Sequence, residues 1–318
     1  MRRQRLLAAL AVTLLCAPGT WLRTEVEHKV PQQIDVALIA GPQPTGTAGW
    51  ERVGVWQYSA ESLHFGGFSA MLALRSGTLQ AFSDRGFRFT LTEPDLPDAT
   101  RQLDRQLVQP GDQYTLTDIE AATRAPDSGH YWLAYEQTHL IHRFTSASAA
   151  DGVRGLTGEV DWPMNSGIEA MVRLADGRFV VLPENNRTGL IFVADPVDGG
   201  KPASFAFRSP AKGYAATDLA QLPDGRLLVL MRSLKRPSPR IWPPFSALLA
   251  IGPAPVAGGT FAPTTALALD GVVPRDNYEG LAVRARQDGR LDVWIMSDDN
   301  FATFQRTLLA KLVFDPSA

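Results

Sequence analysis

A two-stranded unit that recurs five times constrains the fold of this chain more than any other feature of its sequence. In each unit, a run of strand-forming residues leads through a turn that contains glycine into a second such run, as in a β-hairpin. In the last unit, Asn277 begins the first run, Asp288-Gly289-Arg290 forms the turn and Leu291 begins the second run. The five hairpins span residues 68–86, 118–136, 168–184, 217–232 and 277–301.

The spacing of these hairpins predicts a β-propeller. Near the start of each first run stands one polar residue, which we call the start residue; the five are Ser69, Glu120, Glu169, Asp218 and Glu279. They follow one another at intervals of 51, 49, 49 and 61 residues. A period of about 50 residues made of strands is typical of propeller blades and not of helical solenoids. The longer last interval contains an insertion rich in proline, arginine and lysine, from Arg232 to Ser246.

Further strand candidates follow the hairpins and complete four-stranded blades. Third strands are predicted at residues 87–91, 140–144, 190–194, 247–251 and 308–314, and less distinct outer strands at 153–160, 203–207 and 265–269. The last blade ends with the chain, so Arg52 to Tyr58 could supply its fourth strand and close the ring. We therefore predict an all-β propeller of five recognised four-stranded blades within a single domain, residues 31–318. A sixth blade, built from residues 33 to 63, is the alternative.

Acidic residues recur at the open ends of the hairpins. In an antiparallel pair of strands, the sequence numbers of two facing residues add to the same sum all along the pair, so their midpoint lies at the turn. In each hairpin, the midpoint between the start residue and the residue that ends the hairpin falls within one residue of the turn glycine. The start residue and the end residue of each hairpin therefore face each other, apart from a shift of one residue that a β-bulge would cause. Because blades stack with the same polarity, all five open ends gather on one face. This face is predicted to carry the start acids Glu120, Glu169, Asp218 and Glu279 and the end acids Asp84, Glu136, Glu184, Asp298 and Asp299.

So many neighbouring carboxylates require either raised pKa values or bound cations. A ring of oxygens suits Ca²⁺, and the candidate metal ligands are Glu120, Glu184, Asp84 and Asp299. Four arginines follow the end strands and could pair with the acids or hold phosphate, namely Arg85, Arg187, Arg232 and Arg306. Acids repeated in every blade also hold connecting loops by accepting backbone N–H bonds, and this structural role is the alternative for each of them.

Composition and motifs exclude several classes of function. The chain has 31 basic and 33 acidic residues, which gives no reason to expect nucleic acid or an anionic membrane as a partner. Its only cysteine, Cys16, lies in the N-terminal segment, so the mature chain would have no thiolate nucleophile. The run Gly67-Phe-Ser69 lacks the second glycine of a hydrolase nucleophile elbow. We expect a monomer that acts on a small molecule.

The N-terminus predicts export. A basic start, Met1 to Arg5, precedes an apolar stretch from Leu6 to Ala17. About a dozen apolar residues suit a secretory signal peptide and are too few to span a bilayer comfortably. We expect residues 1–30 to comprise a signal peptide and a short lead, and the mature protein to be periplasmic or secreted without stable membrane insertion. An uncleaved anchor is the alternative.

Several motifs resemble those of the bacterial phytase-like family, whose members carry the label "esterase-like activity of phytase". They are the Asp-Gly-Arg turns, Ser83 to Gly86, Pro183 to Asn186, and Asp298 to Phe301 followed by Arg306. The resemblance covers roughly residues 50 to 315, and it implies a propeller, export and acidic residues with phosphoesterase-type chemistry. The sequence departs from the family's pattern in the fourth hairpin, where Met231-Arg232 stands in place of an acid followed by arginine.

Two hypotheses of function follow. In the first, the protein is a metal-dependent phosphoesterase in which Glu169, Glu279, Asp298 and Arg306 are catalytic. Its substrate would be held by Arg85, Arg187 and Arg232. In the second, it is a non-catalytic propeller that binds a ligand or a partner at the cell envelope, because no nucleophile and base can be recognised from their spacing.

Overall fold

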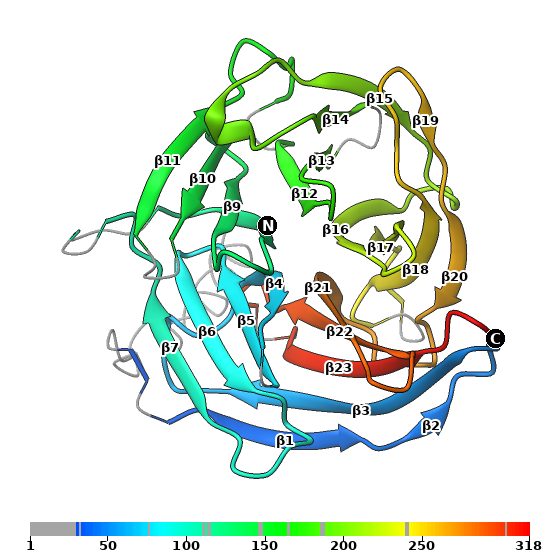
Figure 1. Ribbon diagram of the computed structural model, residues 1–318. Helices are drawn as coiled ribbons and strands as arrows, with labels where there is room; N and C mark the ends of the chain where they lie inside the picture. Colours follow the sequence, from blue (N-terminus) through cyan, green and yellow to red (C-terminus); the bar gives the residue numbers. More distant parts are fainter. Residues whose placement is uncertain are drawn as a thin grey trace, which may run out of the picture.

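Five sheets surround a central axis as the blades of a β-propeller (Figure 1). The computed structural model describes residues 30–31, 33–75, 77–109, 112, 116–145, 149–163, 166–184, 188–238, 242–302 and 304–318. The predicted signal peptide lies outside these residues. The five-bladed all-β architecture confirms the prediction from the hairpin period. Nothing in the described part of the chain is a helix with the length and apolar character needed to cross a membrane.

The first four blades each run outward from the axis in chain order. The first blade contains β4 (Phe68–Ala73), β5 (Thr78–Ser83), β6 (Phe87–Thr92) and β7 (Arg101–Arg105). The second contains β8 (Ile119–Arg124), β9 (Tyr131–Tyr135), β10 (Leu140–Phe144) and β11 (Ala150–Gly155). The third contains β12 (Ile168–Arg173), β13 (Phe179–Pro183), β14 (Thr188–Phe192) and β15 (Ala203–Phe207), with the short β19 (Thr260–Phe261) at its edge. The fourth contains β16 (Ala215–Gln221), β17 (Arg226–Leu234), β18 (Phe245–Pro253) and β20 (Thr264–Ala268). A single 3-10 turn, η1 (Pro196–Asp198), lies between β14 and β15.

The fifth blade joins the two ends of the chain. Its inner strands are β21 (Asn277–Ala285), β22 (Leu291–Asp298) and β23 (Thr307–Phe314). The fourth strand, β3 (Trp50–Ser59), pairs antiparallel with β23, which confirms the predicted closure by an N-terminal strand. Beyond it, β1 (Asp35–Ala40) and β2 (Gln43–Pro44) pair with β3. The residues considered for a sixth blade thus extend the fifth, and the described strands form no sixth sheet.

The burial pattern explains why the sequence of the inner strands is so apolar. Each blade packs both faces against neighbouring blades, so strands near the axis are buried on both sides. All eight residues of β22 are buried, including Trp294. The outer strand β11 instead alternates half-buried and exposed residues, and β7, whose sequence is polar, was not predicted.

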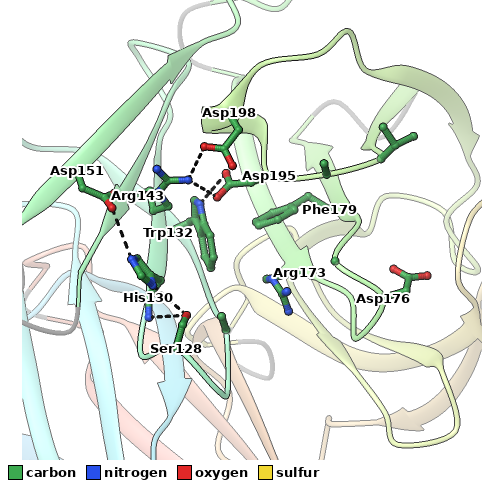
Figure 2. Close-up of a pocket in the computed structure, with 14 residues that line it drawn as sticks. Ser128, His130, Trp132, Arg143, Asp151, Arg173, Asp176, Phe179, Asp195 and Asp198 are labelled. Atoms are coloured by element: carbon green, nitrogen blue, oxygen red, sulfur yellow. Dashed lines mark hydrogen bonds and ion pairs between the residues drawn. The ribbon is translucent and has the colours of Figure 1, made fainter.

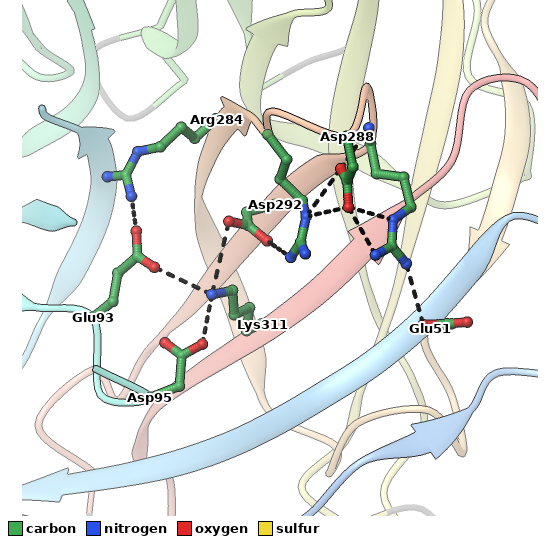
Figure 3. Close-up of polar contacts among 9 residues, drawn as sticks. Glu51, Glu93, Asp95, Arg284, Asp288, Asp292 and Lys311 are labelled. Carbon is green, nitrogen blue, oxygen red and sulfur yellow. Dashed lines mark hydrogen bonds and ion pairs between the residues drawn. The ribbon is translucent and has the colours of Figure 1, made fainter. Parts of the chain in front are cut away.

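A buried ion-pair network joins the fifth blade to the first at the face where the hairpins turn (Figure 3). The Lys311 ammonium lies 2.6 Å from Asp95 Oδ2, 3.2 Å from Glu93 Oε2 and 3.7 Å from Asp292 Oδ2. Arg284 of β21 also pairs with Glu93. Because Glu93 and Asp95 belong to the first blade, these pairs add side-chain contacts where the ring closes.

Candidate active site at the mouth of the propeller

A β-bulge at the open end of each hairpin positions the repeated start residue. In the first blade, pairing steps from Phe68–Ser83 to Ala70–Phe82, so Ser69 has no partner across the ladder. The same step leaves Glu120, Glu169 and Glu279 unpaired in the ladders of their own blades. A bulge re-aims the side chain that it carries. The acids found by sequence spacing are therefore bulge residues of the second, third and fifth blades.

The fourth blade departs from this pattern by one residue. Pairing there steps from Ala216–Met231 to Asp218–Leu230, so the bulge residue is Thr217. The prediction that Asp218 belongs to the ring of start acids was therefore wrong. A one-residue shift moves a side chain to the other face of a strand.

Asp218 instead holds three blades together. Its side chain is fully buried, and burial raises its pKa well above the usual range. Oδ2 accepts the N–H of Leu281 in the fifth blade at 2.7 Å, and Oδ1 accepts the N–H of Leu219 at 2.7 Å. A further backbone bond comes from Met71 in the first blade. These contacts give Asp218 a structural role.

One arginine lies between acids of different blades. Arg232 Nη2 is 3.1 Å from Glu279 Oε1 and 3.7 Å from Glu169 Oε1, and both carboxylates are buried. Asn277 Nδ2 donates to Glu279 Oε1 at 2.9 Å. We call the group formed by Glu120, Glu169, Glu279, Asp298 and Arg232 the acidic mouth.

Burial and mutual repulsion raise the pKa values of carboxyls in the acidic mouth. For Glu169, burial and the charge of Glu279 raise the pKa well above its usual range in spite of Arg232. Burial and the charge of Glu169 raise the pKa of Glu120 in the same way. Burial and the charge of Glu279 raise the pKa of Asp298. Burial opposes a charged Arg232, yet the surrounding carboxylates raise its pKa as well. Burial and repulsion in this group therefore favour the protonated form of Glu120, Glu169 and Asp298.

Three carboxylates beside the acidic mouth lie close enough to share a cation. One oxygen each from Asp118, Glu120 and Glu136 lies within 4.8 Å of the others, and we call these residues the carboxylate triad. Oxygens bound to Ca²⁺ at about 2.4 Å can lie at most about 4.8 Å apart, so the triad fits one such ion. Burial and the charge of Asp118 raise the pKa of Glu136 to about 7. The positive charge of a cation would relieve this repulsion.

The triad includes two residues that the sequence analysis did not assign as ligands. Glu136 was recognised only as an end acid. Asp118 stands two residues before Glu120, and this spacing was the available signal. It has a positive φ of 74°, and its Oδ2 accepts the N–H of Gln137 at 2.6 Å, which fixes the carboxylate.

Two other predicted ligands lie at the junction of the first and fifth blades. Asp299 Oδ1 accepts the N–H groups of Gly67 at 3.0 Å and Phe301 at 3.1 Å, and Oδ2 accepts the Thr307 hydroxyl at 2.8 Å. Burial raises the pKa of Asp84 to about 6. A Cβ at Gly67 would lie 2.2 Å from Asp84 Oδ1, so only glycine fits this close approach. Asp299 thus connects loops.

The remaining predicted residues have separate partners. Arg306 Nε donates to Asp276 Oδ2 at 3.0 Å, and Asp276 is a buried acid that the sequence analysis missed. Arg85 stacks 3.3 Å from the centre of the Phe301 ring. Glu184, a predicted metal ligand, is not part of the carboxylate triad, and it accepts a hydrogen bond from the Ser166 hydroxyl at 3.4 Å. Arg187 lies outside the described residues.

Comparison with known proteins identifies a family. Residues 63–301 match the model of the phytase-like family, described as "Esterase-like activity of phytase". No curated protein matches the chain. Among solved structures, hydrazine synthase of Kuenenia stuttgartiensis is similar at 12% identity and a TM-score of 0.39, over 79% of this chain and 63% of that one. A streptogramin B lyase is similar at 10% identity and a TM-score of 0.40, over 90% of this chain and 100% of that one.

Proposed function

The chain belongs to the phytase-like family, and on that premise we propose that it is an exported, metal-dependent phosphoesterase that acts at the acidic mouth. The observation that carries the proposal is the carboxylate triad next to two buried acids bridged by Arg232. Family membership supports a small-molecule substrate, and the basic and apolar N-terminus supports export.

Ca²⁺ is the cation that we propose for the carboxylate triad. Asp118, Glu120 and Glu136 would hold it through carboxylate oxygens, the ligand type that hard cations prefer. When bound, such a cation stabilises the negative charge that develops on a phosphoryl group during transfer.

The buried acids of the mouth would move protons. Glu169 is our candidate general acid, because burial and the charge of Glu279 raise its pKa and so favour the protonated form, which can donate to a leaving oxygen. Glu279 is our candidate general base. Arg232 and Asn277 both contact its Oε1, which fixes the carboxylate while Oε2 accepts a proton from water. Arg232 would also hold the anionic part of the substrate, and Asp298 completes the negative wall of the mouth.

Hydrolysis assays test this proposal. Purified protein is incubated with phosphate monoesters and diesters, with Ca²⁺ and with a chelator. We expect Ca²⁺-dependent hydrolysis that falls by about 100-fold or more in Glu169→Gln, the usual contribution of a general acid. Glu61→Gln, which changes an exposed carboxylate, is the matched control and should keep full activity. If no phosphate ester is hydrolysed with Ca²⁺, the proposal is wrong.

A second candidate is a non-catalytic propeller that binds a ligand or a partner at the cell envelope. Asp218 and Asp299 favour it, since both use their carboxylates to hold backbone and loops. In that case Glu169→Gln and Glu279→Gln would reduce thermal stability or ligand binding, and no ester would be hydrolysed. Hydrolysis that either change abolishes in a folded protein would exclude this candidate.

A further inference from the structure

Two exposed aromatic side chains lie together on the face that carries the acidic mouth. Trp242 and Phe304 are 53% and 46% exposed, and their ring centres are 5.1 Å apart at an angle of 43°. Trp242 belongs to the insertion that follows β17, and Phe304 belongs to the loop that follows β22. Both strands finish at the open ends of their hairpins. The two rings therefore meet on the mouth face, at the junction of the fourth and fifth blades.

A third exposed apolar side chain, Leu234, lies beside the acidic mouth. Leu230 of β17 packs in the same core as Leu281 of the fifth blade. Side chains two residues apart point to the same side of a strand, so Arg232 and Leu234 also face the fifth blade. The ion pair between Arg232 and Glu279 agrees with this direction. Leu234 is thus an exposed apolar residue one strand repeat, about 7 Å, from Arg232.

Phe304 is also connected to the mouth through its own loop. The next residue, Gln305, is buried, and its Nε2 donates to the backbone carbonyl of Asp298 at 3.3 Å. Asp298 is a member of the acidic mouth. Leu234, Trp242 and Phe304 therefore border the mouth on the side of the fourth and fifth blades, and we call these three residues the apolar rim.

The size and chemistry of the apolar rim suit a small aromatic ligand. Single exposed apolar side chains are common on protein surfaces, but two rings that meet from separate loops form a patch. Specific protein interfaces bury about 800 Å² on each partner, which is more than three partly exposed side chains provide. A flat ring packs favourably on exposed aromatic side chains, in stacked or edge-to-face arrangements.

A cavity of about 610 Å³ between the second and third blades lacks these features (Figure 2). Its lining carries three carboxylates that share the single guanidinium of Arg143. They belong to Asp151, Asp195 and Asp198. Its two rings, Trp132 and Phe179, are only 4% and 0% exposed. This cavity is net negative and has no aromatic surface to offer, so the apolar rim is the better place for an aromatic anion.

We propose that the apolar rim binds an aromatic ring in the alcohol part of the phosphate ester that the acidic mouth hydrolyses. This assignment rests on the proposed phosphoesterase function and names its substrate class as aryl phosphates. The phosphate lies at the mouth beside Arg232, and the ring lies against Trp242, Phe304 and Leu234.

The mouth can accept the phosphate of such an ester. Burial raises the pKa values of Glu169 and Asp298, and the protonated forms that this favours lower the negative charge that a phosphate meets there. In the reaction, water attacks phosphorus and the bond between phosphorus and the ester oxygen breaks. Glu279 takes a proton from the water and Glu169 gives one to the departing oxygen, so the products are a phenol and inorganic phosphate.

Steady-state kinetics with two esters test the apolar rim. 2-Naphthyl phosphate has an aromatic alcohol, and glycerol 2-phosphate has none. We expect the ratio of their kcat/KM values, naphthyl over glycerol, to fall about tenfold in Trp242→Ala and in Phe304→Ala, because the ring loses its aromatic contacts. Trp242→Phe keeps a ring and should retain most of the ratio.

Val256→Ala is the matched control for these variants. Val256 is an exposed apolar residue that follows β18, and the last residue of β18, Pro253, pairs with Arg226 beside the hairpin turn. It therefore lies at the face opposite the mouth, and its variant should have the wild-type ratio. Circular dichroism confirms that each variant is folded.

Calorimetry with 2-naphthol separates this inference from the phosphoesterase proposal, since this ligand has the ring without the phosphate. We expect saturable binding to the full chain, at least about fivefold weaker in Trp242→Ala. If neither ester is hydrolysed and 2-naphthol binds in this way, the aromatic site is supported and only the phosphoesterase proposal is wrong. An unchanged ratio in Trp242→Ala and Phe304→Ala would overturn the inference. So would the absence of 2-naphthol binding to the wild type, or equally tight binding to Trp242→Ala.

Discussion

Removing the Asp218 carboxylate tests how the fourth blade is joined to its neighbours. The side chain is 0% exposed, and its two oxygens accept N–H bonds from Leu281 and Leu219, both at 2.7 Å. In Asp218→Ala these donors lose their acceptor in a place that water does not reach. Asp218→Asn keeps one carbonyl oxygen and turns an amide toward the other donor.

The expected loss follows from the number of donors left without a partner. Each buried donor without an acceptor costs about 1–3 kcal/mol, so the three donors Leu281, Leu219 and Met71 predict a loss of about 3–9 kcal/mol in the free energy of unfolding. The variant no longer has to bury a polar carboxyl group, and this saving in desolvation free energy offsets part of the loss. We therefore expect a value in the lower half of that range. Such a loss corresponds to a melting temperature lower by roughly 4–9 °C for a protein of this size. Asp218→Asn should lose about half as much.

Urea and thermal unfolding followed by circular dichroism measure the effect. Asp224→Ala is the matched control, because Asp224 lies in the turn of the same blade and forms an exposed pair with Arg226. A change at such a surface position should stay within about 0.5 kcal/mol. If Asp218→Ala has the same urea midpoint and melting temperature as this control, Asp218 does not connect the blades.

Three further predictions concern ion pairs and pH. Lys311→Met removes the ammonium that Glu93 and Asp292 share and leaves them only Arg284 and Arg286 as cations, so urea unfolding should show a loss of up to about 3–5 kcal/mol, and wild-type stability would refute a role in ring closure. Arg232→Met lets Glu169 and Glu279 repel each other, so its melting temperature should fall further below that of the wild type at alkaline pH than at acidic pH; an equal loss at both would contradict this. Folding raises the pKa of Glu136 to about 7, so its contribution to stability is present below the unfolded pKa of 4.5 and is lost as the pH rises through 7. In chelator, Glu136→Gln should therefore flatten the decline of the melting temperature across this range, and an unchanged profile would be inconsistent with the raised pKa.

The fold could be predicted from sequence because its signals are local and repeated. Strand patterns, turn glycines and a constant period all lie within each hairpin, and the missing fourth strand followed from counting. The bulges could not be located in this way, since a shift of one residue leaves composition and period unchanged. Asp218 and Thr217 are neighbours in sequence, yet the structure gives them different roles.

The sequence predicted which face of the propeller carries the candidate site, but it did not predict which residues pair with one another there. Spacing was enough to gather the acids at the open ends. It could not show that Arg306 pairs with Asp276, because that contact depends on how two loops pack. It also could not show that Trp242 and Phe304 meet, because the two rings come from loops of different blades.

Calcium titration calorimetry at neutral pH tests the central claim most directly. The account predicts that the wild type binds one Ca²⁺ with release of protons, because Glu136 has a pKa of about 7 and must lose its proton to act as a ligand. Glu120→Gln removes a ligand of the carboxylate triad and should weaken binding at least about tenfold, while Glu61→Gln should bind normally. No binding at about 10 mM Ca²⁺, above the range of weak extracellular sites, would contradict the account. Unchanged binding in Glu120→Gln would do so equally.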